Sequence, residues 1–402
     1  MKRKILPIAL LAMLALGCSA KASAQDISID ETNFPDPGLR EYVQTAYDMN
    51  KDGVLSDEEN KNAKKMNAYF NADPNLIVTI QEEPTYDYYN LDAWKVRSEF
   101  PCSQIAEHPL SEVVPTVSSH YVYYVVGVYP WEHVINSGVR NWKGLELLTS
   151  LKEITVGGAL SQDCVLTGSK SITSISIGGV TSEFENFTVR NCPNLIFFDF
   201  APTRKLKKIN LSKVSKTLCQ LWQSEFNNSS VAGKRKRVEI IVGDAPKLKQ
   251  IQIRIEPVKK LKINYTSLKR LHKMCMLIED KKADLDLSLC KKLTYLTVHG
   301  IYRKMVLPNK RLSSNVDDGP DENFDEDEMI SFGSKMGPRM LDLSKSTRAR
   351  DYADQYIFPE LMSKLKEGKV RTQTLIVSKK MYDNRWNTLR LLQKKGITVQ
   401  VK

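Results

Sequence analysis

The chain of 402 residues is long enough for two or three ordinary domains or for one extended repeat array. Apolar residues make up 42% of it and charged residues 26%, which excludes a wholly disordered chain. The formal net charge of +12 allows two interpretations. It either attracts anionic glycans, lipid head groups or nucleic acid, or it is a solvated basic surface without a partner.

Residues 1–24 are typical of a secretory signal peptide. Basic residues at 2–4 precede an apolar run over 5–17, which is too short for a permanent membrane span. Two cleavage sites are open, one after Ala24 and one before Cys18, a position typical of a lipidated cysteine. The sequence therefore predicts an exported protein, either secreted or bound to the cell surface or outer membrane through a lipid anchor at Cys18.

Residues 26–70 are expected to form a small helical unit of the EF-hand type. Apolar residues recur at three- and four-residue steps from Phe34 to Tyr47. A second, weaker helix is expected over 60–66, and Ser56 and Glu59 have the spacing of a capping box at its start.

The segment between these helices, 48–59, reads DMNKDGVLSDEE and has the pattern of a calcium-binding loop. Gly53 occupies the sixth position, where the backbone bends with a positive φ, and Leu55 is the apolar anchor at the eighth. Oxygen donors stand at positions one, three, five, seven, nine and twelve: Asp48, Asn50, Asp52, the carbonyl of Val54, Ser56 through a water, and Glu59. The sequence predicts a Ca²⁺ site with a dissociation constant of about 10⁻⁴–10⁻³ M, because the loop stands alone. The alternative is a polar turn between helices.

Residues 71–140 are expected to form an irregular connector or cap. Prolines interrupt the segment repeatedly, and only 121–129 (YVYYVVGVY) is typical of a strand.

From residue 141 to 402 the chain repeats a short phrase, an aliphatic residue followed by two more at the third and fifth positions after it. The copies begin at separations of 21, 23, 11, 42, 10 and 35 residues. They are 151–156, 172–177, 195–200, 206–211, 248–253, 258–263 and 293–298. The segments 341–344 and 374–377 are degenerate late copies, and 397–401 is expected to be a closing strand.

A small residue stands three positions before the first aliphatic in five copies: Ser169, Cys192, Thr203, Ala245 and Cys290. The recurrence predicts a mostly β solenoid of stacked rungs rather than an ordinary β-rich domain. An acidic insertion, 313–338, interrupts it and is expected to be unstructured, since 317–328 contains almost no apolar residue.

The helical unit with its loop (34–59), followed by WKGLELLTSLKEITV (142–156), resembles bacterial cell-surface leucine-rich-repeat proteins. The C-x-x-L turns at Cys192 and Cys290 resemble the cysteine-bearing repeats of surface adhesins in that group. The resemblance implies a leucine-rich-repeat solenoid and binding of an extracellular protein or a glycan, without catalysis. Residues 67–140 and the irregular periods depart from the family pattern.

A secreted hydrolase, or an accessory domain of one, with a site in 71–140 is the alternative from another class. Cys102 could act as a nucleophile with His108, His120 or His133 as base, although no known nucleophile motif surrounds Cys102. A structural surface component without a discrete ligand is a third option. The sequence favours a protein that is not an enzyme.

The basic cluster 234–237 (KRKR) invites a nucleic-acid interpretation, but an exposed loop is the simpler one. Because the protein is expected to be exported, we expect no nucleic-acid partner. Anionic glycans are the better candidates for this cluster. The cysteines that remain after export show no paired metal-binding pattern, and an oxidising compartment permits disulfides among them.

Overall fold

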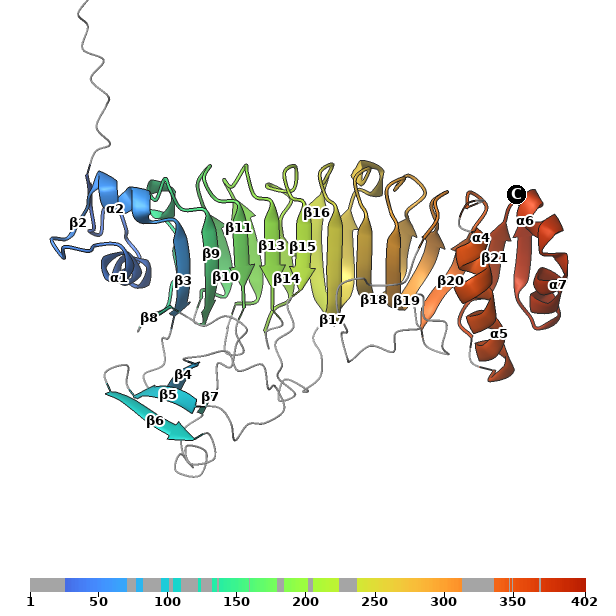
Figure 1. Ribbon diagram of the computed structural model, residues 1–402, viewed down its shortest axis with the longest axis horizontal. Coiled ribbons are helices and arrows are strands. Elements are labelled where there is room, and N and C mark those ends of the chain that lie inside the picture. Colours follow the sequence, from blue (N-terminus) through green and yellow to red (C-terminus); the bar gives the residue numbers. More distant parts are fainter. Residues whose placement is uncertain are drawn as a thin grey trace, which may run out of the picture.

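The fold is mostly β and is dominated by one long row of parallel strands, as the computed structural model in Figure 1 shows. The described residues are 26–70, 77–81, 95–100, 104–109, 122–123, 132–135, 137–158, 160–178, 184–201, 205–223, 237–312, 336–346, 348, 350–368 and 370–402.

The helices are few and gather at the two ends of the row of strands (Figure 1). They are α1 (Pro37–Ala46), α2 (Asp57–Asn62), α4 (Arg350–Tyr352), the π-helical turn Ala353–Ile357, α5 (Phe358–Lys366), α6 (Lys379–Asn384) and α7 (Trp386–Lys394), with 3₁₀ turns at Leu145–Leu147 and Tyr265–Ser267.

The strands belong to three sheets. The largest contains β3 (Lys65–Phe70), β8 (His133–Ile135), β9 (Glu153–Gly158), β10 (Asp163–Thr167), β11 (Ser174–Ile177), β12 (Asn186–Arg190), β13 (Phe197–Phe200), β14 (Lys208–Asn210), β15 (Gln220–Gln223), β16 (Val238–Gly243), β17 (Gln250–Ile263), β18 (Lys273–Asp286), β19 (Tyr295–Val306), β20 (Gly337–Asp342), β21 (Thr374–Val377) and β22 (Thr398–Val401). The smaller sheets are β1 (Ile27–Ser28) with β2 (Val54–Leu55), and β4 (Ile77–Gln81), β5 (Lys95–Phe100), β6 (Gln104–Pro109) and β7 (Val122–Tyr123).

The large sheet has the sequential stacking of a solenoid. Twelve of its strands follow the order β22-β21-β20-β19-β18-β17-β15-β13-β11-β9-β3-β8. A branch of β10, β12, β14 and β16 runs beside them and meets β17. We call one set of strands face 1; it consists of β9, β11, β13, β15 and the first halves of β17, β18 and β19. Face 2 consists of β10, β12, β14, β16 and the second halves of β17, β18 and β19.

Each rung therefore contributes one strand to each face, which explains the irregular separations of the sequence phrase. The copies at 206–211 and 258–263 lie on face 2, and the other five lie on face 1. On face 1, directly paired residues are 21, 23, 23, 30, 23 and 22 positions apart: Glu153, Ser174, Phe197, Gln220, Gln250, Lys273 and Tyr295. The short separations of 11 and 10 measure the step from one face to the other.

Alternation within each strand builds the interior of the solenoid. In β9 the side chains of Ile154 and Val156 are buried while Glu153 is exposed, and β12 repeats the pattern with Phe187 and Val189. One continuous apolar core runs from Ile29 at one end to Ile397 at the other. Stacking thus buries apolar side chains that no single rung could bury alone.

Several expectations from the sequence can be compared with these elements. The late copies at 341–344 and 374–377 end β20 and form β21, and the closing strand is β22, as predicted. The weak helix expected over 60–66 is wrong at its end, because α2 stops at Asn62 and Met66 lies buried in β3. Of 121–129 only β7 is described.

Residues 1–25 and 313–335 lie outside the described part, so the signal peptide, the anchor at Cys18 and the character of the insertion remain predictions. The predicted end of the insertion at 338 is wrong, because β20 begins at Gly337. Among the described helices, none combines the length and apolar character that crossing a membrane requires.

Candidate functional site

The predicted calcium loop joins α1 to α2, and local hydrogen bonds build both helix starts. Asp36 caps α1, where its carboxylate accepts from the backbone of Gly38 at 3.0 Å and of Leu39 at 3.1 Å. At α2 the backbone N–H of Ser56 donates to Glu59 Oε2 at 2.9 Å, and that of Glu59 donates to Ser56 Oγ at 3.3 Å. The capping box expected from the sequence is thereby confirmed.

The loop backbone bends where the sequence placed its glycine. Gly53 has φ +77°, and a Cβ added there would meet no atom within 4 Å, so conformation rather than space favours glycine. Lys51 also has a positive φ of 61°. The positive φ predicted at Gly53 is confirmed.

A strand from the preceding segment holds the loop in place. β1 pairs with β2 in antiparallel register, Ile27 opposite Leu55, and Ile29 N donates to Gly53 O at 2.9 Å. Leu55 is buried, as expected of the apolar anchor. The segment before α1 thus supplies a strand partner to a loop that has no second loop beside it.

The carboxylates of the first and last loop residues are both buried. Asp48 and Glu59 are 6% and 8% exposed. Asp48 Oδ2 accepts from Gly53 N at 3.0 Å, and Glu59 Oε1 accepts from Met49 N at 2.8 Å. Burial alone would raise the pKa of Glu59, but hydrogen bonds from Ser56 and from the backbone of Met49 and Asn50 outweigh it and lower that pKa. Glu59 is therefore held as an anion beside the first loop position.

The other predicted calcium ligands with polar side chains form hydrogen bonds within the loop. Asn50 Nδ2 donates to Asp52 Oδ2 at 2.8 Å, and Ser56 Oγ donates to Glu59 Oε2 at 2.7 Å. Within the described ranges no three His, Cys, Asp or Glu side chains converge on one metal position. The six donors are all oxygens, and oxygen is the ligand that Ca²⁺ prefers, whereas zinc sites use nitrogen and sulfur. The chemistry of the donor set fits calcium, which would take over the two side-chain contacts.

The two helices attach the loop to the first rungs of the solenoid. Asp36 Oδ2 accepts from the backbone of Arg140 at 2.8 Å and of Asn141 at 2.9 Å, and Asn60 Nδ2 donates to Leu147 O at 3.0 Å. Trp142 is buried against Phe70 of β3 with ring centroids 6.0 Å apart. The helices on both sides of the loop are therefore in direct contact with the first rungs.

The residues of the alternative catalytic site are only partly placed. Cys102 and His120 lie outside the described residues, and His108 lies on β6. His133 lies on β8 with its ring edge-on to Tyr42 at 5.5 Å, and burial lowers its pKa against the opposing charge of Glu132. This position is that of a packed histidine between α1 and the sheet.

The buried cysteines have the surroundings of structural residues. Burial raises the pKa of Cys164 and Cys290 to about 12 and that of Cys192 to about 11. Trp142 Nε1 donates to Cys164 Sγ at 3.1 Å. Cys192, Ala245 and Cys290 are fully buried beneath their turns, as the repeat pattern predicts for small residues there, while Ser169 is half-buried and Thr203 lies outside the described part.

A second turn signature escaped the sequence analysis. At the ends of three face 2 strands, and of β20 beside them, an Asn or Asp side chain accepts from the N–H of a Ser or Thr two residues later, at 3.0–3.1 Å. The pairs are Asn210 with Ser212, Asn264 with Thr266, Asp286 with Ser288, and Asp342 with Ser344. The recurring [DN]-x-[ST] could have identified face 2 in the sequence.

The basic cluster 234–237 is described only at Arg237, whose Nε lies 2.7 Å from Glu279 Oε2. At least this member of the cluster is paired with a carboxylate.

Comparison with models of protein families, with curated proteins and with solved structures finds no match.

Proposed function

We propose that this chain is an exported, calcium-stabilised repeat protein that binds a protein or an anionic glycan at the cell surface. The observation that carries the proposal is the loop of 48–59, which has an oxygen at every required position, a glycine with positive φ and two buried carboxylates. Export is proposed on residues 1–24 alone, with either a free N-terminus after Ala24 or a lipid at Cys18.

We further propose that the rungs are of the leucine-rich-repeat type. Most rungs on face 1 are 21–23 residues apart, within the range of 20–29 typical of that class. The fully buried Cys192 and Cys290 in C-x-x-L turns support the same assignment.

A binding role agrees with the regular shape of the molecule. Stacked rungs offer long surfaces on which the same position recurs from rung to rung, and solenoids use such surfaces to bind macromolecules. We therefore propose recognition of a large partner and no catalytic step.

Calcium would act at the end of the row. The first rung has a neighbouring rung on one side only and depends on the helical unit for its remaining contacts. At 10 mM Ca²⁺ and a dissociation constant of 10⁻⁴–10⁻³ M, binding would stabilise the folded state by about 1.4–2.7 kcal/mol.

The test is calcium titration of the mature chain by calorimetry and thermal melting. Wild type should bind one Ca²⁺, and its N-terminal transition should move to higher temperature. Glu59→Gln should lose the heat of binding and the shift, while Glu58→Gln, on the exposed side of the same helix, should retain both. Equal responses of the two variants, or no heat at millimolar Ca²⁺, would refute the calcium site.

A further inference from the structure

The turns that lead into the face 1 strands stack into one straight edge of the solenoid. One backbone hydrogen bond per rung, 2.7–2.9 Å long, connects each turn to the next. These bonds run through Lys152, Thr173, Ile196, Cys219, Lys249, His272 and Thr294. Figure 1 shows the short turns side by side along the upper edge of the row of strands. Equivalent turn residues are therefore neighbours in space, about 4.8 Å apart.

This edge is strongly basic. Its first turn, 144–152, contains Glu146. Its later turns are 168–173, 190–196, 212–219, 244–249, 264–272, 286–294 and 307–312, and the only carboxylates of these later turns are Asp244 and Asp286. Their basic residues are Lys170, Arg190, Lys213, Lys216, Lys247, Lys249, Lys269, Arg270, Lys291, Lys292, Lys310 and Arg311. We call these twelve residues the basic edge.

Equal charges stand directly beside one another in the basic edge. Lys247, Arg270 and Lys292 each lie two residues before the hydrogen-bonded position of their rung, so they occupy the same place in three consecutive turns. Like charges opposite each other on neighbouring strands destabilise a sheet. The three cations therefore repel one another, and an anion that lies across the rungs would offset this repulsion.

Several cations on face 2, unlike those of the basic edge, form ion pairs with carboxylates. Lys207 lies 2.5 Å from Glu185, Lys262 lies 2.6 Å from Glu239, and Arg303 is paired with Asp284. No member of the basic edge forms an ion pair with another described residue. Face 2 thus pairs several of its cations with carboxylates, whereas the described members of the basic edge form no such pairs.

Two further observations place these charges on one surface. Partial burial and the charges of Lys292, Lys249 and Lys310, which come from three different turns, lower the pKa of His272. Near the N-terminal end, a groove of about 980 Å³ runs across the turns and is lined by Lys170, Arg190 and Lys213, with Ser169 and Asn191 as hydrogen-bonding groups and Glu146 as its one carboxylate.

The composition of the edge indicates which polyanion it fits. Nine of the twelve cations are lysines, which act as point charges, whereas nucleic-acid sites favour arginine and interleave aromatic side chains for base stacking. Tyr265 is the one aromatic residue in these turns, and burial raises its pKa well above the ordinary value. A straight row of point charges suits a chain of regularly spaced sulfate or carboxylate groups better than a stack of bases.

We propose that the basic edge is a binding surface for a linear sulfated or carboxylated polysaccharide that lies along the solenoid axis across the stacked turns. This inference rests on the proposed function and specifies its partner and its surface. The row from Lys170 to Lys292 covers five rung steps, about 24 Å. Affinity should therefore rise with oligosaccharide length until this row is covered.

The experiment measures binding of the mature chain to heparin-derived oligosaccharides of graded length and to hyaluronate oligosaccharides. The edge variant carries Lys247→Glu, Arg270→Glu and Lys292→Glu. The control variant carries Lys259→Glu, Lys281→Glu and Lys282→Glu, which make the same charge change at exposed positions away from the turns. Wild type should bind longer oligosaccharides more tightly and lose affinity with salt. The edge variant should bind at least about tenfold more weakly with an unchanged melting temperature, and the control should match wild type within about twofold.

The possible outcomes distinguish failure of the basic edge as the binding surface from failure of the anionic glycan as the partner. Equal loss in both variants, or no loss in the edge variant, would overturn the basic edge while leaving glycan binding intact. No binding of wild type to any of these oligosaccharides would overturn the anionic glycan as the partner. Tighter binding of wild type to DNA of equal charge, or to vesicles containing phosphatidylglycerol, would replace the polysaccharide with another polyanion.

Discussion

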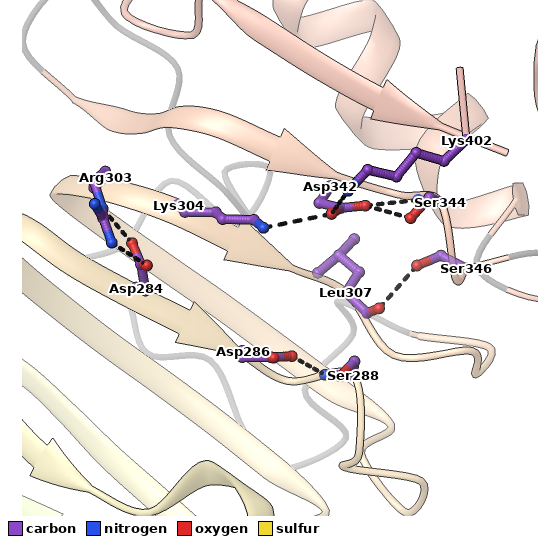
Figure 2. A network of polar contacts seen from close by, with 10 residues as sticks. All are labelled: Asp284, Asp286, Ser288, Arg303, Lys304, Leu307, Asp342, Ser344, Ser346 and Lys402. Carbon is purple, nitrogen blue, oxygen red and sulfur yellow. Dashed lines mark hydrogen bonds and ion pairs between the residues drawn. The ribbon is translucent and has the colours of Figure 1, made fainter. Parts of the chain in front are cut away.

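One buried acid in this protein, Asp342, is surrounded by hydrogen-bond donors and cations. Asp342, at the end of β20, is 4% exposed and accepts from the backbone of Ser344 at 3.0 Å and from its hydroxyl at 2.6 Å. Lys304 Nζ lies 3.6 Å and Lys402 Nζ 3.5 Å from its Oδ2, so one carboxylate connects three strands (Figure 2). Burial alone would raise its pKa, but Ser344 and the two lysines outweigh burial and lower it.

The lowered pKa has a consequence for stability in acid. A carboxyl whose pKa is lower in the folded than in the unfolded state stabilises the fold above the unfolded value of 3.8, and the contribution disappears as the pH falls through the folded value. Asp342→Asn should destabilise the protein by about 1–3 kcal/mol at pH 7, with a difference that is constant above about pH 5 and shrinks below about pH 4. Urea unfolding at several pH values measures it. Asp383→Asn, in an exposed i,i+4 pair with Lys379, is the control and should change little. A pH-independent difference for Asp342→Asn would contradict this account.

At the scale of elements, the corners between the faces depend on close approach of neighbouring rungs. Gly158 and Gly300 stand five residues after the aligned Glu153 and Tyr295, both with positive φ, of 87° and 102°. A Cβ on Gly158 would lie 2.2 Å from Phe70 O, and one on Gly300 would lie 2.0 Å from Ile278 O. These corners therefore need glycine both for the backbone conformation and for the space.

The two requirements can be separated by comparing two glycines. Gly368, after α5, has φ +67° but no atom within 4 Å of an added Cβ. Gly368→Ala should cost about 1 kcal/mol for the left-handed conformation alone. Gly300→Ala should cost at least about 3 kcal/mol, because the backbone of β18 must also move. Guanidinium unfolding compares the two, and equal losses would show that the rungs can separate at this corner without cost.

The sequence predicted the strands of the solenoid better than their arrangement. Strands of both faces bury alternate residues, so the same phrase describes 151–156 on face 1 and 206–211 on face 2. Two face 1 strands were missed because their inward residues are not the usual aliphatics: Gln223 ends β15, and Met274 and Met276 fill β18.

Of the two candidate sites, the loop of 48–59 could be predicted from the sequence and the basic edge could not. The loop of 48–59 is formed by consecutive residues, so its glycine, its capping box and its apolar anchor could be predicted from spacing alone. The basic edge could not, because rungs of 21–30 residues prevent its cations from recurring at a fixed interval in the sequence. Only the strand register aligns Lys247 with Arg270 and Lys292.

For the whole molecule, stacking makes stability a property of neighbouring rungs. The helical unit covers the first rungs, where Phe34, Leu39 and Tyr42 are buried. At the other end Tyr352 OH donates to Leu296 O at 3.2 Å, and Leu389 and Leu392 of α7 are buried beside β22. Each end of the row therefore has its own helical cover, and the two covers are about as far apart as the molecule allows (Figure 1).

A substitution that destabilises one helical cover should therefore destabilise the nearest rungs but not the distant ones. Asp36 is the test residue, because its carboxylate caps α1 and also holds the backbone of Arg140 and Asn141. Asp36→Ala should cost about 1–3 kcal/mol locally, from a lost helix cap and two partly buried N–H groups without their partner. Hydrogen exchange should accelerate in β3, β9 and β11 and remain at the wild-type rate in β18 and β19, since each rung responds to its neighbours.

The matched control for this experiment is Asp30→Ala. Asp30 also accepts backbone hydrogen bonds, from Thr32 at 2.9 Å and Asn33 at 3.0 Å, but both lie within its own exposed turn. Its removal should leave exchange in β3 and β9 unchanged. Acceleration of β18 and β19 by Asp36→Ala, equal to that of β3, would mean that the rungs unfold as a single unit. In that case calcium bound in the loop of 48–59 would stabilise the whole row, including the basic edge, and not only the end at which it binds.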